Sequence, residues 1–218
     1  MITSKYFSKA SIMKILIIDY GMGNLGSVKS AFERCGYDVI ISKEPKDADK
    51  ANALILPGVG SFDVAMNNLS EKGWDEILKI YALDRGIPLW GICLGMQLLA
   101  DIGYENSKCS GLGLIAGKVK KLIPSNNQEH IPHIGWNEIL FEKHCAIFDD
   151  IKSGTDFYFV HSYHFIPATN DNILSITPYC GHFVSSICQN NILGTQFHPE
   201  KSTTPGMKLI KNFIKYSS

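Results

Sequence analysis

The sequence predicts a single-domain α/β fold, with helices flanking a mostly parallel central sheet and additional antiparallel strands. In the first half of the chain, apolar runs rich in β-branched residues alternate with segments of helical periodicity, the order that builds a parallel sheet. In the second half, short and often alternating runs are separated by turn residues, which indicates further, partly antiparallel strands. A length of 218 residues suits one domain with a sizeable core.

The first four elements follow in order from residue 14. KILIIDY (14–20) is a short apolar run that predicts a buried strand. SVKSAFERCG (27–36) has apolar residues at helical spacing and ends in glycine, which predicts a helix. YDVIIS (37–42) predicts a second strand, and ANALILPG (51–58) predicts a third, which a proline and a glycine stop.

Three further elements lead to the middle of the chain. WDEILKIYALDRG (74–86) predicts an amphipathic helix with a glycine stop. IPLWGIC (87–93) predicts a fourth strand, and LGMQLLADIG (94–103) predicts the helix after it. Because ligands of parallel α/β sheets bind at the carboxyl ends of the strands, the residues that follow these strands are candidates for a site.

The second half predicts five strands and a closing helix, with no linker between them. The strands are expected within 113–122, 133–141, 156–165, 180–189 and 191–198, and the helix within 206–217. Residues 13–218 are therefore predicted to form one domain. Residues 1–12 are mixed polar, lack the apolar segment of a secretory signal, and are expected to be a disordered or extended N-terminal extension.

The composition argues against several classes of partner. The 21 basic and 21 acidic residues cancel, and no basic stripe indicates binding to nucleic acid or to a membrane surface. No apolar stretch reaches the roughly 18 residues that a membrane-spanning helix needs. The six cysteines form no C-x-x-C pair and no zinc spacing, so we expect neither a disulfide framework nor a metal, and a reducing cytoplasm as the location.

Cys93 is the candidate nucleophile. It lies in GICLG (91–95), between a predicted strand and a predicted helix, which matches the form of a G-x-S-x-G nucleophile elbow. The glycines permit a tight turn that projects the thiol at the top of the sheet. The amide N–H of Leu94 belongs to the unpaired donors of a helix N-terminus and points toward the same space. The alternative is that Cys93 is an unreactive core residue in a tight turn.

A base and an orienting carboxylate are predicted in HPE (198–200). Pro199 biases His198 toward extended backbone, and residues two apart in extended chain share a side, so Glu200 can approach the His198 ring. A carboxylate at one ring nitrogen leaves the other free to take the thiol proton. Backbone N–H groups of Gly58, Val59 or Gly60, directly after the third strand, are candidate oxyanion donors beside Leu94.

A glycine-rich loop supports a different class of function. GMGNLG (21–26) matches G-x-G-x-x-G between a strand and a helix, and Glu44 stands about 20 residues further on, where a ribose-binding acid is found in dinucleotide-binding folds. Asp19 opposes this hypothesis, because a carboxylate there repels an incoming pyrophosphate. On these residues alone, a nicotinamide- or flavin-dependent dehydrogenase stays open as an alternative.

Several motifs together carry a resemblance to a known family. GICLGMQ (91–97), PGVG (57–60) and FHPEKS (197–202) resemble class I (triad) glutamine amidotransferases, whose fold is flavodoxin-like. More narrowly, DYGMGNLGSV (19–28), PHIGWN (132–137) and YFVHSY (158–163) resemble the glutaminase subunits of imidazole glycerol phosphate synthase. The similarity extends from about Met13 to the last predicted helix.

The resemblance implies an enzyme without a cofactor. Cys93 would attack the side-chain amide of glutamine and form a thioester, His198 would transfer protons, and Glu200 would hold His198. Gln97, Ser162 and Tyr163 match residues of the glutamine pocket, and residues 58–60 match the oxyanion strand. The ammonia would pass to a (β/α)₈-barrel cyclase subunit of a heterodimer in histidine biosynthesis.

The same resemblance assigns the glycine-rich loop to partner docking, which displaces the dinucleotide hypothesis. Asn24, Trp136, Tyr158 and Lys201 match positions at or near the subunit interface. The chain departs from the family pattern in residues 1–12 and in Ile134, where methionine is frequent. An alternative is a paralogous subunit that supplies ammonia to a sugar-nucleotide or surface-polysaccharide pathway through a related barrel synthase, since the triad recognises only glutamine.

Overall fold

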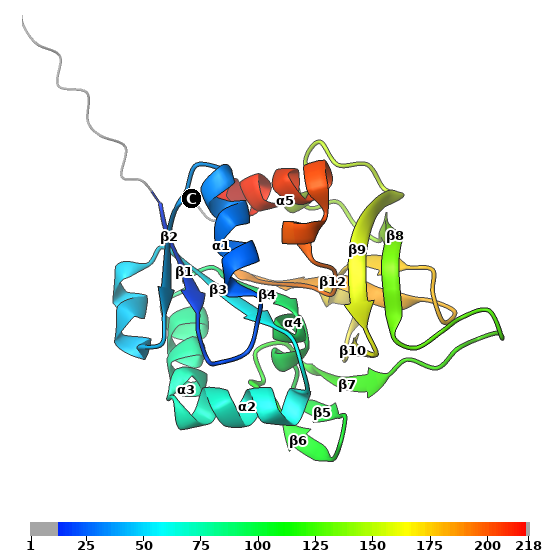
Figure 1. Ribbon diagram of the computed structural model, residues 1–218, viewed down its shortest axis with the longest axis horizontal. Helices are drawn as coiled ribbons and strands as arrows, with labels where there is room; N and C mark the ends of the chain where they lie inside the picture. Colours follow the sequence, from blue (N-terminus) through cyan, green and yellow to red (C-terminus); the bar gives the residue numbers. More distant parts are fainter. Residues whose placement is uncertain (1–12, 217–218) are drawn as a thin grey trace, which may run out of the picture.

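A nine-stranded mixed sheet forms the centre of the computed structural model, which describes residues 13–216 (Figure 1). Its strands lie in the order β2-β1-β3-β4-β13-β12-β11-β8-β9. The first five are mutually parallel: β2 (Asp38–Ser42), β1 (Lys14–Ile18), β3 (Ala53–Gly58), β4 (Leu89–Cys93) and β13 (Ile192–Thr195). The remaining four continue it in antiparallel pairs: β12 (Phe183–Gln189), β11 (Ile173–Thr177), β8 (His133–Phe141) and β9 (Thr155–His161).

A second, four-stranded sheet carries the order β10-β7-β5-β6. Its strands are β10 (Tyr163–Pro167), β7 (Gly117–Lys121), β5 (Ile102–Tyr104) and β6 (Lys108–Ser110). The predicted α/β class with additional antiparallel strands is confirmed, and the parallel part makes up one half of the large sheet. The predicted extension at residues 1–12 lies outside the described residues.

Helices cover both faces of the parallel strands. Figure 1 shows α1 (Leu25–Arg34) and α5 (Thr203–Tyr216) above the sheet, and α2 (Phe62–Glu71) and α3 (Trp74–Lys79) below it. The strand β1 alternates accordingly: Ile15 and Ile17 pack in one core layer with α1 and α5, whereas Leu16 and Ile18 pack in the other. Strands buried on both faces read as continuous apolar runs, which is why this part was visible in the sequence.

The predicted helix at 94–103 is wrong in its second half. Helix α4 ends at Leu98, and residues from Ile102 form β5 instead. The reason is a returning loop: the N–H of Leu112 donates to the carbonyl of Leu98 at 2.9 Å, and the N–H of Leu114 donates to that of Leu99 at 2.9 Å. These carbonyls would otherwise accept bonds within a longer helix.

Other differences also have local causes. The structure adds α2, β6 and β11 to the predicted elements. The run 156–165 divides at Ser162 into β9 and β10, which belong to different sheets. Helix α3 continues into a π-helical turn (Ile80–Asp84) before the chain enters β4. No helix within residues 13–216 is long and apolar enough to cross a membrane.

Candidate active site

Cys93 stands at a strained junction between β4 and α4. Its backbone has φ 55° and ψ −111°, a region that non-glycine residues rarely adopt. Such conformations cost about 1–3 kcal/mol and persist only where the surroundings enforce them. The side chain is 6% exposed, and its Sγ lies 3.7 Å from the carbonyl of Val160. The predicted elbow is therefore present in the structure.

Three glycines make the elbow possible by close approach of backbone. A Cβ on Gly95 would lie 1.8 Å from the carbonyl oxygen of Leu56, and one on Gly91 would lie 2.5 Å from that of Gly95. A Cβ on Gly58 would lie 2.5 Å from the hydroxyl of Tyr20. No side chain fits at these distances, so the glycines allow α4 to pack directly on β3 and β4.

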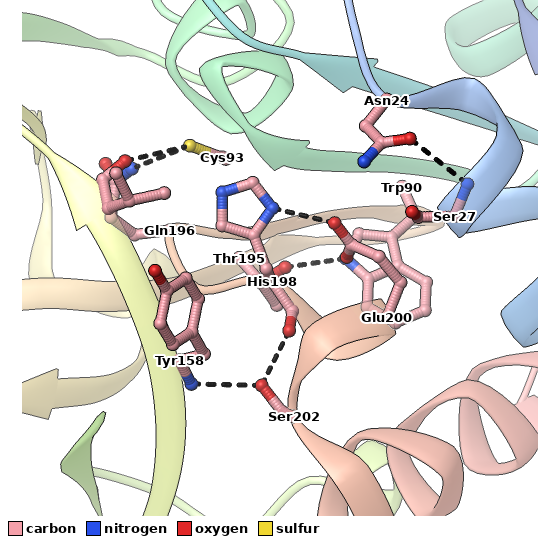
Figure 2. A network of polar contacts seen from close by, with 11 residues as sticks. Asn24, Ser27, Trp90, Cys93, Tyr158, Thr195, Gln196, His198, Glu200 and Ser202 are labelled. Carbon is pink, nitrogen blue, oxygen red and sulfur yellow. Dashed lines mark hydrogen bonds and ion pairs between the residues drawn. The ribbon is translucent and has the colours of Figure 1, made fainter. Parts of the chain in front are cut away.

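His198 and Glu200 form a buried pair beside the elbow (Figure 2). Nδ1 of His198 lies 2.8 Å from Oε1 of Glu200, and the two side chains are 3% and 2% exposed. The local geometry differs from the expectation: His198 is extended, with φ −100° and ψ 96°, but Glu200 lies in a 3₁₀ turn, Pro199–Lys201. Proline suits the first position of such a turn, which brings the carboxylate back onto the ring.

The ring of His198 lies between Cys93 and Glu200, as Figure 2 shows. Burial by itself would lower the pKa of His198, but interactions with Cys93 and Glu200 outweigh it and raise that pKa well above its usual value. Nε2 of His198 is buried without a hydrogen-bond partner, and Sγ of Cys93 lies near the carbonyl of Val160 and Nε2 of Gln196. The structure thus brings the three predicted residues together.

A cavity of about 260 Å³ opens in front of Cys93. Six of the predicted substrate and oxyanion residues line it: Val59, Gly60, Leu94, Gln97, Ser162 and Tyr163. Gly58 does not line it but pairs with Cys93 in the register of β3 and β4. The Gln97 side chain donates from Nε2 to the carbonyl of Tyr163 at 2.8 Å and to Oε1 of Gln196 at 3.0 Å.

Three residues of the site have no counterpart in the predictions. Gln196 is fully buried and places Nε2 3.8 Å from Sγ of Cys93. Glu105 adds a carboxylate to the cavity wall, and burial raises its pKa. His161 also lines the cavity. Gln196 precedes the FHPE motif in the chain and follows β13, the strand beside β4, and this adjacency is the signal that could have identified it.

Three of the residues expected at a partner interface contact one another. Trp136 is 50% exposed on β8, and its ring contacts that of Tyr158 edge to face with centroids 6.1 Å apart. Lys201 places Nζ 5.6 Å from the centre of the Tyr158 ring. Asn24 lies at the start of α1, a helix that contacts the turn Pro199–Lys201, and its Oδ1 accepts the N–H of Ser27 at 3.3 Å (Figure 2).

The glycine-rich loop is occupied by contacts within the chain. Oδ1 of Asp19 accepts the N–H of Gly21 at 3.0 Å, and Gly23 packs on the ring of Pro57. A bound pyrophosphate would need such N–H groups free and would meet the Asp19 carboxylate. The loop geometry therefore argues against a dinucleotide site. No cluster of three or more His, Cys, Asp or Glu side chains suited to a metal occurs in residues 13–216.

Comparisons with known proteins agree with this geometry. The family model "Glutamine amidotransferase class-I" matches residues 16–216. The chain is 48% identical to imidazole glycerol phosphate synthase subunit HisH 1 of Campylobacter jejuni (strain RM1221), covering 92% of this chain and 99% of that protein. It is 44% identical to subunit HisH of Aquifex aeolicus (strain VF5), covering 92% and 96%. The solved structure of PurLQS from Thermotoga maritima has a TM-score of 0.73 at 18% identity, covering 95% and 100%, which shows a shared fold.

Proposed function

Because the chain belongs to the class-I glutamine amidotransferase family, we propose that it is the glutaminase subunit of an imidazole glycerol phosphate synthase. In this role it hydrolyses glutamine to glutamate and ammonia, and a (β/α)₈-barrel cyclase subunit uses the ammonia in histidine biosynthesis. The observation that carries the proposal is the strained Cys93 at the wall of a cavity, beside the buried His198–Glu200 pair.

The chemistry begins at the thiol of Cys93. His198 takes the thiol proton as the sulfur attacks the side-chain carbonyl carbon of glutamine, and the C–N bond breaks as His198 passes that proton to the departing nitrogen, which leaves as ammonia. Water then attacks the thioester as His198 takes one of its protons, and the C–S bond breaks as His198 returns that proton to the sulfur, which releases glutamate and restores the thiol. Glu200 holds the ring through Nδ1 and favours the charged imidazolium. The raised pKa of His198 agrees with this role as proton donor.

The cavity offers groups for the rest of the substrate. Backbone N–H groups of Leu94, Val59 and Gly60 are the candidates to stabilise the oxyanion. Since Nε2 of Gln97 is engaged, its Oε1 is the atom left to accept a bond from glutamine. The carboxylate of Glu105 complements the α-ammonium of glutamine, and Ser162 and Tyr163 complete the wall.

The proposed partner surface consists of Ile134, Trp136, Tyr158 and Lys201. Ile134 and Trp136 are exposed on β8, and Tyr158 and Lys201 join them from β9 and from the turn that carries the triad. Exposed apolar and aromatic residues in one patch are typical of a protein interface. Asn24, on the loop that packs on Pro57, is proposed as a further docking residue.

The proposal is tested with the chain in complex with its cyclase subunit. We expect glutamine-dependent synthesis of imidazole glycerol phosphate by the wild type. Cys93→Ser should abolish that synthesis, while synthesis from added ammonium salt continues, because the cyclase reaction itself needs only ammonia. Loss of both reactions, or of neither, contradicts the proposal.

A further inference from the structure

A pair of buried histidines joins the cavity to the strand that carries Trp136. His133 on β8 lies directly opposite His161 on β9 in the register of the two strands. Nδ1 of His133 and Nε2 of His161 are 3.1 Å apart. Both side chains are buried, at 4% and 6% exposed, although only His161 lines the cavity.

The hydrogen-bond partners determine which ring nitrogen of each histidine carries the proton. The carbonyl of Tyr163 can only accept, so Nδ1 of His161, 2.9 Å away, must donate to it. Nε2 of a neutral His161 is then an acceptor, which makes Nδ1 of His133 the donor between the rings. Nε2 of His133 is then left to accept a hydrogen bond from Nδ2 of Asn137 at 3.3 Å. Oδ1 of Asn137 accepts the backbone N–H of Glu138 at 2.9 Å, which fixes the amide.

Burial and packing hold both rings neutral and fixed. Burial lowers the pKa of His133 to about 4 and that of His161 to about 3. The His133 ring stacks on Tyr179 with centroids 4.0 Å apart, and Phe183 lies edge-on to both histidines. Neither ring is therefore suited to exchange protons with a substrate near neutral pH, which leaves a role in orientation.

The bonds continue from the histidines toward the nucleophile. The Tyr163 carbonyl that accepts from His161 also accepts Nε2 of Gln97. Gln97 in turn donates to Gln196, whose Nε2 lies 3.8 Å from Sγ of Cys93. This carbonyl is the point where the histidine pair and the side chains around Cys93 meet.

We propose that His161 and His133 are positioning residues that fix the direction of the Tyr163 carbonyl and thereby the side chain of Gln97. With Nε2 held, Gln97 presents Oε1 to the glutamine pocket. This inference rests on the proposed function, because glutamine is the ligand that Gln97 is placed to meet. His133 acts by its hydrogen bond to His161. Asn137, adjacent to Trp136, holds the other side of the His133 ring.

The test compares three variants in the complex with the cyclase subunit. His161→Phe keeps a ring but removes the donor to Tyr163, and we expect the KM for glutamine to rise about tenfold with a smaller change in kcat. His161→Asn places an amide nitrogen near the position of Nδ1 and should restore most of the loss. His164→Phe is the matched control: Nδ1 of His164 has no hydrogen-bond partner, so the KM should stay near that of the wild type.

A spectroscopic measurement tests the same bonds without activity. Nitrogen-15 NMR of the histidine rings in the full chain should show both His133 and His161 neutral with the proton on Nδ1. A proton on Nε2 of His161, or equal KM values for His161→Phe and His164→Phe, would overturn the proposal, as would a His161→Asn variant no better than His161→Phe. A wild type that fails to hydrolyse glutamine would instead refute the proposed function, and the two failures are therefore distinct.

Discussion

At the scale of single residues, the site depends on how a few side chains are held. Cys93 has a positive φ, which the β4–α4 turn enforces, and its sulfur stands at the cavity wall. Two bonds hold His198: its backbone N–H donates to the carbonyl of Tyr158 at 2.9 Å, and its ring Nδ1 contacts Glu200. The backbone of His198 also accepts the hydroxyl of Ser202 at 2.6 Å. These contacts orient the ring before any substrate binds.

Glu200→Gln should lower the pKa of His198, because it removes the negative charge that favours the imidazolium. The pH at which the ring loses its proton then moves downward, which NMR titration of the ring measures. The loss of kcat in Glu200→Gln should be about 50–100-fold smaller than the loss in His198→Ala, since Glu200 orients the base and does not itself transfer protons. An unchanged pKa, or equal loss of kcat in the two variants, would assign Glu200 a different role.

At the scale of elements, the close contact of α4 with β3 and β4 builds the elbow. Its motif was visible in the sequence because the glycines that permit the contact are adjacent to Cys93. The HPE motif was also visible in the sequence, because its three residues are adjacent, although the 3₁₀ turn at Pro199–Lys201 was not. Glu105 and His161 could not be predicted, because folding of the chain brings them to the cavity and no local pattern marks them. Gln196 is 103 residues from Cys93 in sequence, and only its place next to the FHPE motif pointed to it.

Gly95→Ala should destabilise the chain by about 3 kcal/mol or more, because its Cβ would lie 1.8 Å from a backbone oxygen that cannot move without breaking the elbow. Gly26→Ala is the matched control: it lies in α1 with nothing within 4 Å of the added Cβ, and should stabilise by about 0.5–1 kcal/mol. Urea unfolding measures both. A Gly95→Ala variant as stable as the wild type would refute the packing argument.

At the scale of the whole molecule, the parallel half of the sheet supplies the nucleophile and the antiparallel half supplies the proposed partner surface. The parallel half was predictable, since strands buried on both faces have a strong apolar signal. The sheet to which each later strand belongs was not, because one run, 156–165, divides between two sheets at Ser162. That division places Ser162 and Tyr163 at the cavity.

Trp136→Ala should weaken association with the cyclase subunit by about 2 kcal/mol, or roughly 30-fold, since exposed tryptophans at interfaces contribute strongly to binding. Leu83→Ala serves as a control, because Leu83 is similarly exposed but lies in the turn after α3, outside the partner surface. Calorimetric titration of one subunit with the other measures both affinities. Equal affinities for the two variants would place the interface elsewhere.

The proposed reaction requires Cys93 to form a covalent intermediate with glutamine. The most direct measurement is mass spectrometry of the complex after rapid acid quenching during turnover of glutamine. We expect a glutamyl group attached to the peptide that contains Cys93, and none in Cys93→Ala. Glutamate release by Cys93→Ala at the wild-type rate, or a glutamyl group attached to any other residue, would contradict it.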